Sequence, residues 1–169
     1  MTLRGLLRGL RGHAAASAVA GGAEGCCELG MQHAASGQVG KAIECFERAV
    51  SLDPEYAPGY INLGAAYREA GRGVEAIRAC HKALRLTPND PEAHVNLATV
   101  YYEMGSYQEA IKACGKALLA APNYPGAYFV RGLSYIDLGD RGRAFQEYKA
   151  LQMFDREMAD RLFVKLPKR

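Results

Sequence analysis

Five cysteines and four histidines are the side chains of this sequence whose types could hold a metal ion or act as nucleophiles. Cys26, Cys27 and His33 lie close together, but they do not have the spacing of metal ligands, and no C-x-x-C pair occurs. The sequence therefore predicts no metal site.

Catalytic motifs are also missing. The sequence contains no phosphate-binding loop, no G-x-S-x-G, no H-E-x-x-H and no distinctive pair of carboxylates. The acidic residues are spread over solvent-facing positions of expected helices. We therefore expect no catalytic residue, no cofactor and no enzymatic activity.

The elements that would position any site recur with a period of 34 residues, most clearly over residues 57–90. Shifting the register by this period aligns Ile61 and Leu63 with Val95 and Leu97. The same shift aligns three prolines, at positions 54, 88 and 122. A fixed period of this length marks a stacked repeat protein.

Each repeat predicts two helices, because apolar residues recur at helical spacing over two runs of about a dozen residues. A glycine between the runs can adopt the left-handed conformation that closes a helix, as at Gly71. A second glycine or alanine lies mid-helix, as Gly64 does, and we expect close approach of Ala76 from the partner helix there. The expected helix pairs are 23–36 and 39–52, 58–70 and 73–86, 91–104 and 107–120, and 126–138 and 141–154.

The repeat resembles the tetratricopeptide repeat (TPR) family over residues 23–156. The second repeat carries the family pattern as Tyr60, Leu63, Gly64, Tyr67, Ala76, Cys80, Ala83 and Pro88. The fourth repeat departs from it at Arg131, Leu151 and Arg156. The resemblance implies an all-α fold, a right-handed α-solenoid of four helix pairs closed by a C-terminal capping helix. Its parts would be 1–22 as an N-terminal segment, repeats 23–56, 57–90, 91–124 and 125–156, and a cap with tail over 157–169.

The positions of the histidines and cysteines within the repeat also indicate the roles of these residues. His33 and His94 fall where the family has aromatic residues, so packing is expected of them rather than catalysis. Cys80 and Cys114 fall on the same position of successive repeats. Stacked helices lie roughly 8–10 Å apart, whereas a disulfide needs its Cα atoms within about 7 Å. Free core thiols in a reducing compartment are therefore expected.

The resemblance further implies a concave groove lined by the first helix of each repeat. Its floor would be apolar, and Glu69, Glu103 and Asp137 would make one edge acidic. Packing between repeats is the alternative role of the apolar residues. Asn62 and Asn96 would bond the backbone of a bound peptide or, equally well, make a hydrogen bond within the repeats. The candidate groove residues are Cys27, Met31, Ile61, Asn62, Ala65, Arg68, Glu69, Val95, Asn96, Thr99, Tyr102, Glu103, Phe129, Leu133, Ile136 and Asp137.

Such a groove fits a peptide with apolar anchors and basic flanks. It does not fit the C-terminal carboxylate of a heat-shock protein, which related co-chaperones grip with lysines, an arginine and asparagines. At those positions this chain offers Cys27, Met31, Asn62, Glu92 and Asn96, so only Asn62 matches and Glu92 reverses a charge.

The net charge of +3 is too small to demand nucleic acid as a partner. No apolar run approaches the length of a membrane-spanning helix.

Residues 1–22 differ from the rest, with Leu3, Leu6, Leu7 and Leu10 at helical spacing, three arginines and no acid. This composition is typical of a mitochondrial transit peptide, and a flexible extension or a cap on the first repeat are the alternatives. A cytoplasmic location is expected, with mitochondria as the alternative.

The function predicted from these observations is that of an interaction scaffold that binds a partner's peptide in the groove. The alternative is a structural element whose copies assemble through their ends or the N-terminal segment. A homo-oligomer is compatible with either function.

Overall fold

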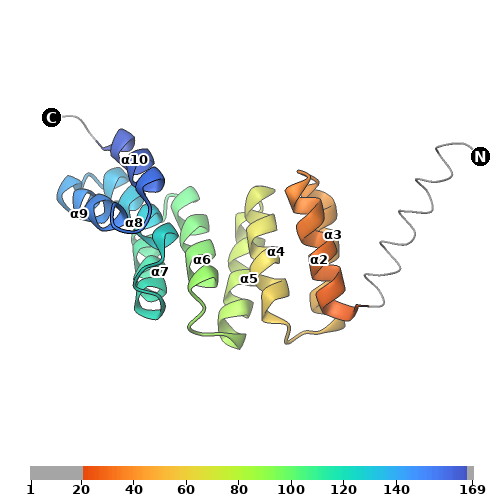
Figure 1. Ribbon diagram of the computed structural model, residues 1–169. Coiled ribbons are helices and arrows are strands. Elements are labelled where there is room, and N and C mark those ends of the chain that lie inside the picture. The colour runs from red at the N-terminus through yellow and green to blue at the C-terminus, as the bar shows by residue number, and fades with distance from the viewer. Residues whose placement is uncertain (1–20, 167–169) are drawn as a thin grey trace, which may run out of the picture. The chain divides into compact units, whose positions relative to one another are not determined.

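A computed structural model describes residues 21–166 of the chain (Figure 1). Over this range the backbone forms nine α-helices and no strand, so the predicted all-α fold of helix pairs is confirmed. The helices are α2 (Gly22–Ala35), α3 (Val39–Leu52), α4 (Ala57–Glu69), α5 (Gly73–Leu86), α6 (Pro91–Glu103), α7 (Tyr107–Ala120), α8 (Pro125–Asp137), α9 (Arg141–Leu151) and α10 (Arg156–Lys165). The expectations for residues 1–20 lie outside the described residues.

A left-handed glycine follows the first helix of each pair, as the sequence predicts. Gly71 has a φ of +72°. The next N–H, that of Arg72, donates to the carbonyl of Tyr67 at 2.8 Å, which satisfies one of the carbonyls left open at the helix end. Each pair is therefore a tight helical hairpin whose turn is set locally by its sequence.

The last helix of the fourth repeat ends earlier than predicted, at Leu151 instead of residue 154. Residues 152–154 form turns, and the side chain of Asp155 accepts a hydrogen bond from the Met158 N–H at 2.9 Å. An aspartate in this position caps a new helix, so α10 starts at Arg156 and the chain changes direction.

The chain divides into two compact units, one up to Leu86 and one from Thr87. In the first unit α2 packs on α3 and α4 packs on α5, and α4 also contacts α2 and α3. Phe46 fills the centre of the first pair and is 2% exposed. A Cβ atom on Gly30 would lie 2.5 Å from its ring. The mid-helix glycine of the first pair thus makes room for an aromatic ring. In the second pair a Cβ atom on Gly64 would lie 2.7 Å from Sγ of Cys80 and 3.5 Å from the carbonyl oxygen of Ala76, so the partner helix approaches closely there.

In the second unit the pairs α6–α7 and α8–α9 pack through α7 and α8, and α10 lies against α8 and α9. Figure 1 shows α10 across the end of the last pair. Two core clusters form, and the second belongs to the cap. The first contains Ala98, Ala113, Cys114, Ala117, Ala127 and Val130, and the second contains Leu151, Ala159 and Leu162.

Arg131 replaces the leucine of the repeat pattern, and a buried ion pair accommodates it. Its Nη2 donates to Oε2 of Glu147 at 2.9 Å, and its guanidinium lies 5.7 Å from the ring centroid of Tyr128. Burial raises the pKa of the Glu147 carboxyl, and Arg131 opposes that rise. The ion pair with Glu147 of α9 thus gives the charged side chain of Arg131 a partner at this half-buried position of α8.

Candidate protein-binding surface

The predicted groove residues of the first unit lie on α2 and α4, and the structure divides them into covered and open positions. Cys27 is 2% exposed and Ile61 is 7% exposed, so neither offers a surface to a partner. Both residues are predicted to line the groove, whereas the structure packs their side chains inside the protein.

Asn62 also turns inward. Its amide Nδ2 donates to Sγ of Cys27 at 3.2 Å, from α4 to α2. Burial raises the pKa of the Cys27 thiol, and the hydrogen bond from Asn62 opposes that rise. Of the two roles considered for Asn62, the structure favours a hydrogen bond within the repeats over one with a peptide backbone.

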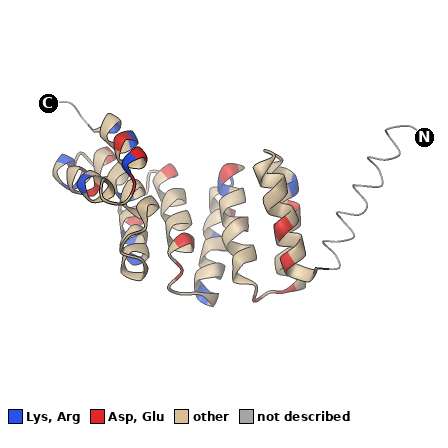
Figure 2. Cartoon of the chain, in the orientation of Figure 1, with Lys and Arg blue, Asp and Glu red and all other residues tan. Residues whose placement is uncertain are grey.

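The open part of this unit is a stripe along α2. Met31 is 47% exposed, and Glu24 and Glu28 are exposed at helical spacing before it. Because residues four and seven apart share one helix face, these three side chains form one strip. Figure 2 shows the acidic positions along α2. On α4 Ala65 and Arg68 are half-buried, and Glu69 is exposed.

Glu24 and Glu28 were not among the predicted site residues, although the repeat register could have found them. Shifting Asn62 back by one period gives Glu28, and Glu24 lies one helical turn before it. The prediction concentrated on apolar positions and on the acidic edge near the helix ends. It therefore missed the acidic residues at the start of the first inner helix.

In the second unit the α6 residues of the predicted groove mostly serve the core. Val95 and Tyr102 pack against the first core cluster. The Thr99 hydroxyl donates to the carbonyl of Val95 at 2.8 Å, within its own helix. Asn96 is half-buried, and its amide Nδ2 is buried without a hydrogen-bond partner.

One carboxylate of the acidic edge in this unit already has a hydrogen-bond partner within the protein. Asp137, at the end of α8, hydrogen-bonds the hydroxyl of Tyr102. Burial, followed by that hydrogen bond, raises the pKa of Tyr102 to about 12, so the phenol keeps its proton. Both Asp137 and Glu103 are exposed. Asp137 thus links α8 to α6 as well as facing solvent.

The three apolar α8 residues of the predicted groove are covered by the cap. Phe129, Leu133 and Ile136 are half-buried and pack against the cluster that contains Leu162 of α10. The guanidinium of Arg161 lies 5.3 Å from the ring centroid of Phe129. Phe129 and Leu133, which are predicted to line the groove, therefore keep only part of their surface exposed. The helix after the fourth repeat is α10, and it takes the apolar face that another repeat would cover.

The remaining chemistry-bearing side chains have structural roles. His94 is 6% exposed, and its Nε2 lies 2.9 Å from the carbonyl oxygen of Pro88. His33 is half-buried, with Nδ1 at 2.9 Å from Oε1 of Gln38. All five cysteines are free thiols. In the part of the chain that the structure describes, no helix is both long and apolar enough to cross a membrane.

Comparison with known proteins places these helix pairs in one family. Models described as tetratricopeptide repeat match residues 67–129 and 125–158, and one described as TPR repeat matches residues 30–71. No curated protein sequence matches the chain.

Solved structures of similar fold are numerous. The MamA protein is 30% identical, over 82% of this chain and 75% of its own, with a TM-score of 0.71. A thermophilic TPR protein from Thermus thermophilus is 22% identical over 84% of this chain and 81% of its own, with a TM-score of 0.75.

A chain of the APC/C hetero-tetramer Cut9–Hcn1 is 22% identical over 87% of this chain, with a TM-score of 0.79. This chain covers 30% of that one. Together with the fold, these matches support a role as a repeat scaffold for protein interaction. The helix pairs, the matched repeats and the relationship to MamA show that this chain belongs to the tetratricopeptide repeat family.

Proposed function

We propose that the chain is a non-catalytic interaction scaffold that binds a basic, partly apolar peptide segment of a partner protein on the α2–α4 face of its first unit. The observation that carries the proposal is the open stripe of Glu24, Glu28 and Met31 on α2. Ala65 and Glu69 of α4 extend this surface. We call these five residues the acidic face.

The chemistry of the acidic face defines the partner. The exposed Met31 offers a flexible apolar contact, which suits side chains of varied shape. The carboxylates of Glu24 and Glu28, which precede it on α2, favour lysine or arginine next to the partner's apolar residue, and they disfavour a C-terminal carboxylate. Charges of this kind mainly set the association rate and the orientation of the ligand, whereas the apolar contact supplies affinity.

The known structures support the proposal in a general way. The Cut9–Hcn1 chain of similar fold was solved in a hetero-tetramer with another protein. The second unit is the weaker candidate, because α10 packs on the apolar residues of α8 that would otherwise face a ligand.

Fluorescence anisotropy with two synthetic twelve-residue peptides tests the proposal. Both peptides have the same leucine-rich centre, and one is flanked by lysines and the other by glutamates. The full chain should bind the lysine-flanked peptide and not the glutamate-flanked one. The double variant Glu24→Lys/Glu28→Lys should reverse that preference, and Met31→Ala should weaken binding of the lysine-flanked peptide by on the order of 1–2 kcal/mol.

Glu44→Lys is the matched control, because Glu44 is exposed on α3, the other helix of the same pair. It changes the net charge in the same direction and should leave binding as in the wild type. Equal losses in the control and in the α2 variants would show that only overall charge matters. That result, or the absence of any binding of the lysine-flanked peptide, would refute the proposal.

A further inference from the structure

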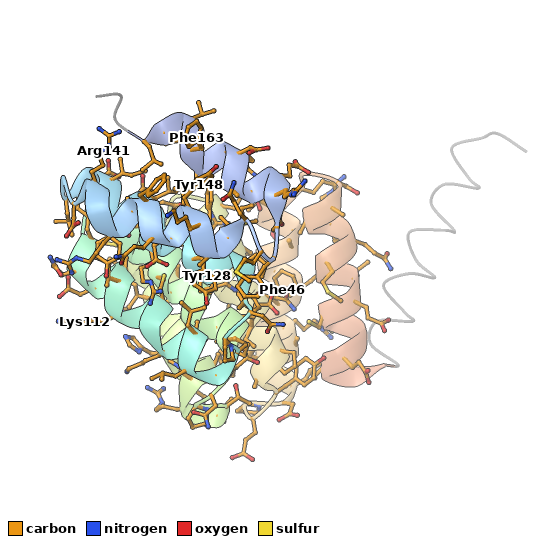
Figure 3. All side chains as sticks on the ribbon, turned by 60° about the vertical axis from the view of Figure 1, so that its left-hand side comes forward. Phe46, Lys112, Tyr128, Arg141, Tyr148 and Phe163 are labelled. Atoms are coloured by element: carbon orange, nitrogen blue, oxygen red, sulfur yellow. The ribbon has the colours of Figure 1, made fainter. Side chains whose placement is uncertain are left out.

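The far end of the second unit carries an apolar surface that the repeat fold does not use. Phe145 of α9 is 41% exposed, and Phe163 and Val164 of α10 are 53% and 82% exposed. Ring centroids lie 5.5 Å apart for Phe145 and Tyr148, and 5.1 Å apart for Tyr148 and Phe163. Figure 3 shows Tyr148 and Phe163 next to each other where α9 and α10 meet. We call Phe145, Tyr148, Phe163 and Val164 the terminal patch.

Capping does not account for the terminal patch. A terminal element of a repeat array needs an apolar inner face and a polar outer face. The inner face of α10 is supplied by Ala159 and Leu162, which are both fully buried. Phe163 and Val164 point elsewhere and remain exposed. A joined set of exposed aromatic and aliphatic side chains marks an interaction surface, and aromatic residues are enriched in such surfaces.

Charges around the terminal patch are divided between its two helices. On α9 Arg141 and Lys149 are exposed and lie four residues before and after Phe145, on the same helix face. Lys149 Nζ lies 5.0 Å from the ring centroid of Phe145. Figure 3 shows Arg141 at the start of the same helix. The α9 side of the patch is therefore basic.

On α10 two acids adjoin the exposed apolar residues. Asp160 lies three residues before Phe163 and four before Val164, and Glu157 lies one helical turn earlier. Both are exposed. The nearby Arg161 is directed to the other side of α10, over the ring of Phe129. The exposed bases Arg156 and Lys165 lie on the same helix, with Arg156 one turn before Asp160, so the α10 side of the patch is acidic only around Glu157 and Asp160.

A surface with an apolar centre, one basic edge and one acidic edge complements a copy of itself. A two-fold axis through its centre places the basic edge of one copy opposite the acidic edge of the other, and it pairs the aromatic centres. We propose that the terminal patch is the interface of a symmetric homodimer, in which Lys149 of each copy faces Asp160 of the second copy. This interface does not involve the acidic face, so a dimer would present two peptide-binding surfaces.

Analytical ultracentrifugation of the full chain over a concentration series tests the interface. The wild type should show a monomer–dimer equilibrium, and Phe163→Ser should shift it towards monomer by at least about tenfold in Kd. Leu119→Ser is the matched control, because Leu119 is an 85% exposed apolar residue on α7 of the same unit. It should dimerise like the wild type. Circular dichroism melting would show that both variants are folded.

Charge reversal gives a second and independent test. By symmetry Lys149→Glu places two pairs of like charges in the dimer, and Asp160→Lys does the same. Each variant alone should therefore dimerise about tenfold or more weakly than the wild type. An equimolar mixture of the two should form heterodimers, because every charge then meets its opposite.

A monomeric wild type would overturn the proposal. It would also be overturned by charge variants that dimerise like the wild type, or by a mixture that stays monomeric. None of these results bears on peptide binding, which is measured on the acidic face with separate variants.

Discussion

His94 and Tyr128 stand one period apart, and both hold the carbonyl of the proline that ends the previous repeat. His94 uses Nε2 on the oxygen of Pro88 at 2.9 Å, and the Tyr128 hydroxyl donates to the oxygen of Pro122 at 2.7 Å. Because a carbonyl only accepts, Nε2 of His94 carries a proton in this contact. The sequence predicted that His94 packs instead of catalysing, because its repeat position belongs to aromatic residues.

His94 makes the stability of the protein depend on pH. Burial lowers the pKa of its imidazole below the value of about 6.5 that it has in an unfolded chain. Below that pH the unfolded state binds the proton more readily than the folded state does. The stability that neutral His94 contributes is therefore complete above pH ~6.5, and it is lost as the pH falls from there through the lower pKa of the folded state.

His94→Tyr should remove this loss, because tyrosine holds the equivalent carbonyl in the next repeat and does not titrate in this range. Urea unfolding of the wild type and the variant at pH ~7.5 and ~5.5 would measure how much stability each protein loses. The midpoint of the variant should change less between the two pH values than that of the wild type. His81→Tyr is the control, since His81 is exposed on α5. A variant with the full pH dependence of the wild type would contradict the assignment to His94.

At the scale of the element, the repeat period predicts the helix pairs well and the cap poorly. Every helix of α2 to α8 begins and ends within about two residues of its predicted bounds, because glycine, proline and apolar spacing recur in each repeat. The tail has no repeat to align with. The sequence therefore does not indicate which of its apolar residues face the last repeat, and the structure buries Ala159 and Leu162 and leaves Phe163 exposed.

The contact between α8 and α10 depends on one glycine. A Cβ atom on Gly132 would lie 2.6 Å from Cδ2 of Leu162, closer than real side chains pack. Gly132→Ala should therefore lower the melting temperature, although alanine favours a helix by about 1 kcal/mol. The physical reason is that the added methyl group pushes Leu162 out of the cap's core.

Gly115→Ala is the matched control for this substitution. Gly115 lies within α7, and a Cβ atom there would have nothing within 4 Å. The same methyl group should then stabilise the protein by roughly 0.5–1 kcal/mol. Thermal melts followed by circular dichroism would compare the two variants. If both substitutions raise the melting temperature, α10 accommodates the added methyl group without loss of stability, and the prediction for Gly132 is wrong.

At the scale of the whole molecule, the predicted groove survives only in part. The period correctly identifies inner-helix positions, but it does not say which neighbour covers each side chain. Cys27 and Ile61 are buried, and Phe129 is covered by a helix from outside the repeats. Met31 and Glu69 remain exposed to solvent. Burial depends on contacts between elements, which one sequence with a regular period does not encode position by position.

The net charge of the chain comes from its first twenty residues. The chain has 21 basic and 18 acidic residues. Three of the bases, Arg4, Arg8 and Arg11, lie in residues 1–20, which contain no acid. Residues 21–169 are therefore balanced in charge, and removing the segment removes the whole net charge of +3. A segment of this composition affects what the chain is attracted to more than how its repeats fold.

Deleting residues 1–20 should accordingly leave the helical circular dichroism spectrum and the melting temperature unchanged, because the core clusters of the second unit and Phe46 of the first lie wholly within residues 21–166. Fluorescent fusions of the full and shortened chains should show the same cytoplasmic distribution in a eukaryotic cell. A clearly lower melting temperature would instead identify the segment as a cap on the first repeat. Mitochondrial fluorescence that requires the segment would identify it as a transit peptide, because its arginines and leucines would then act as an address instead of an extension.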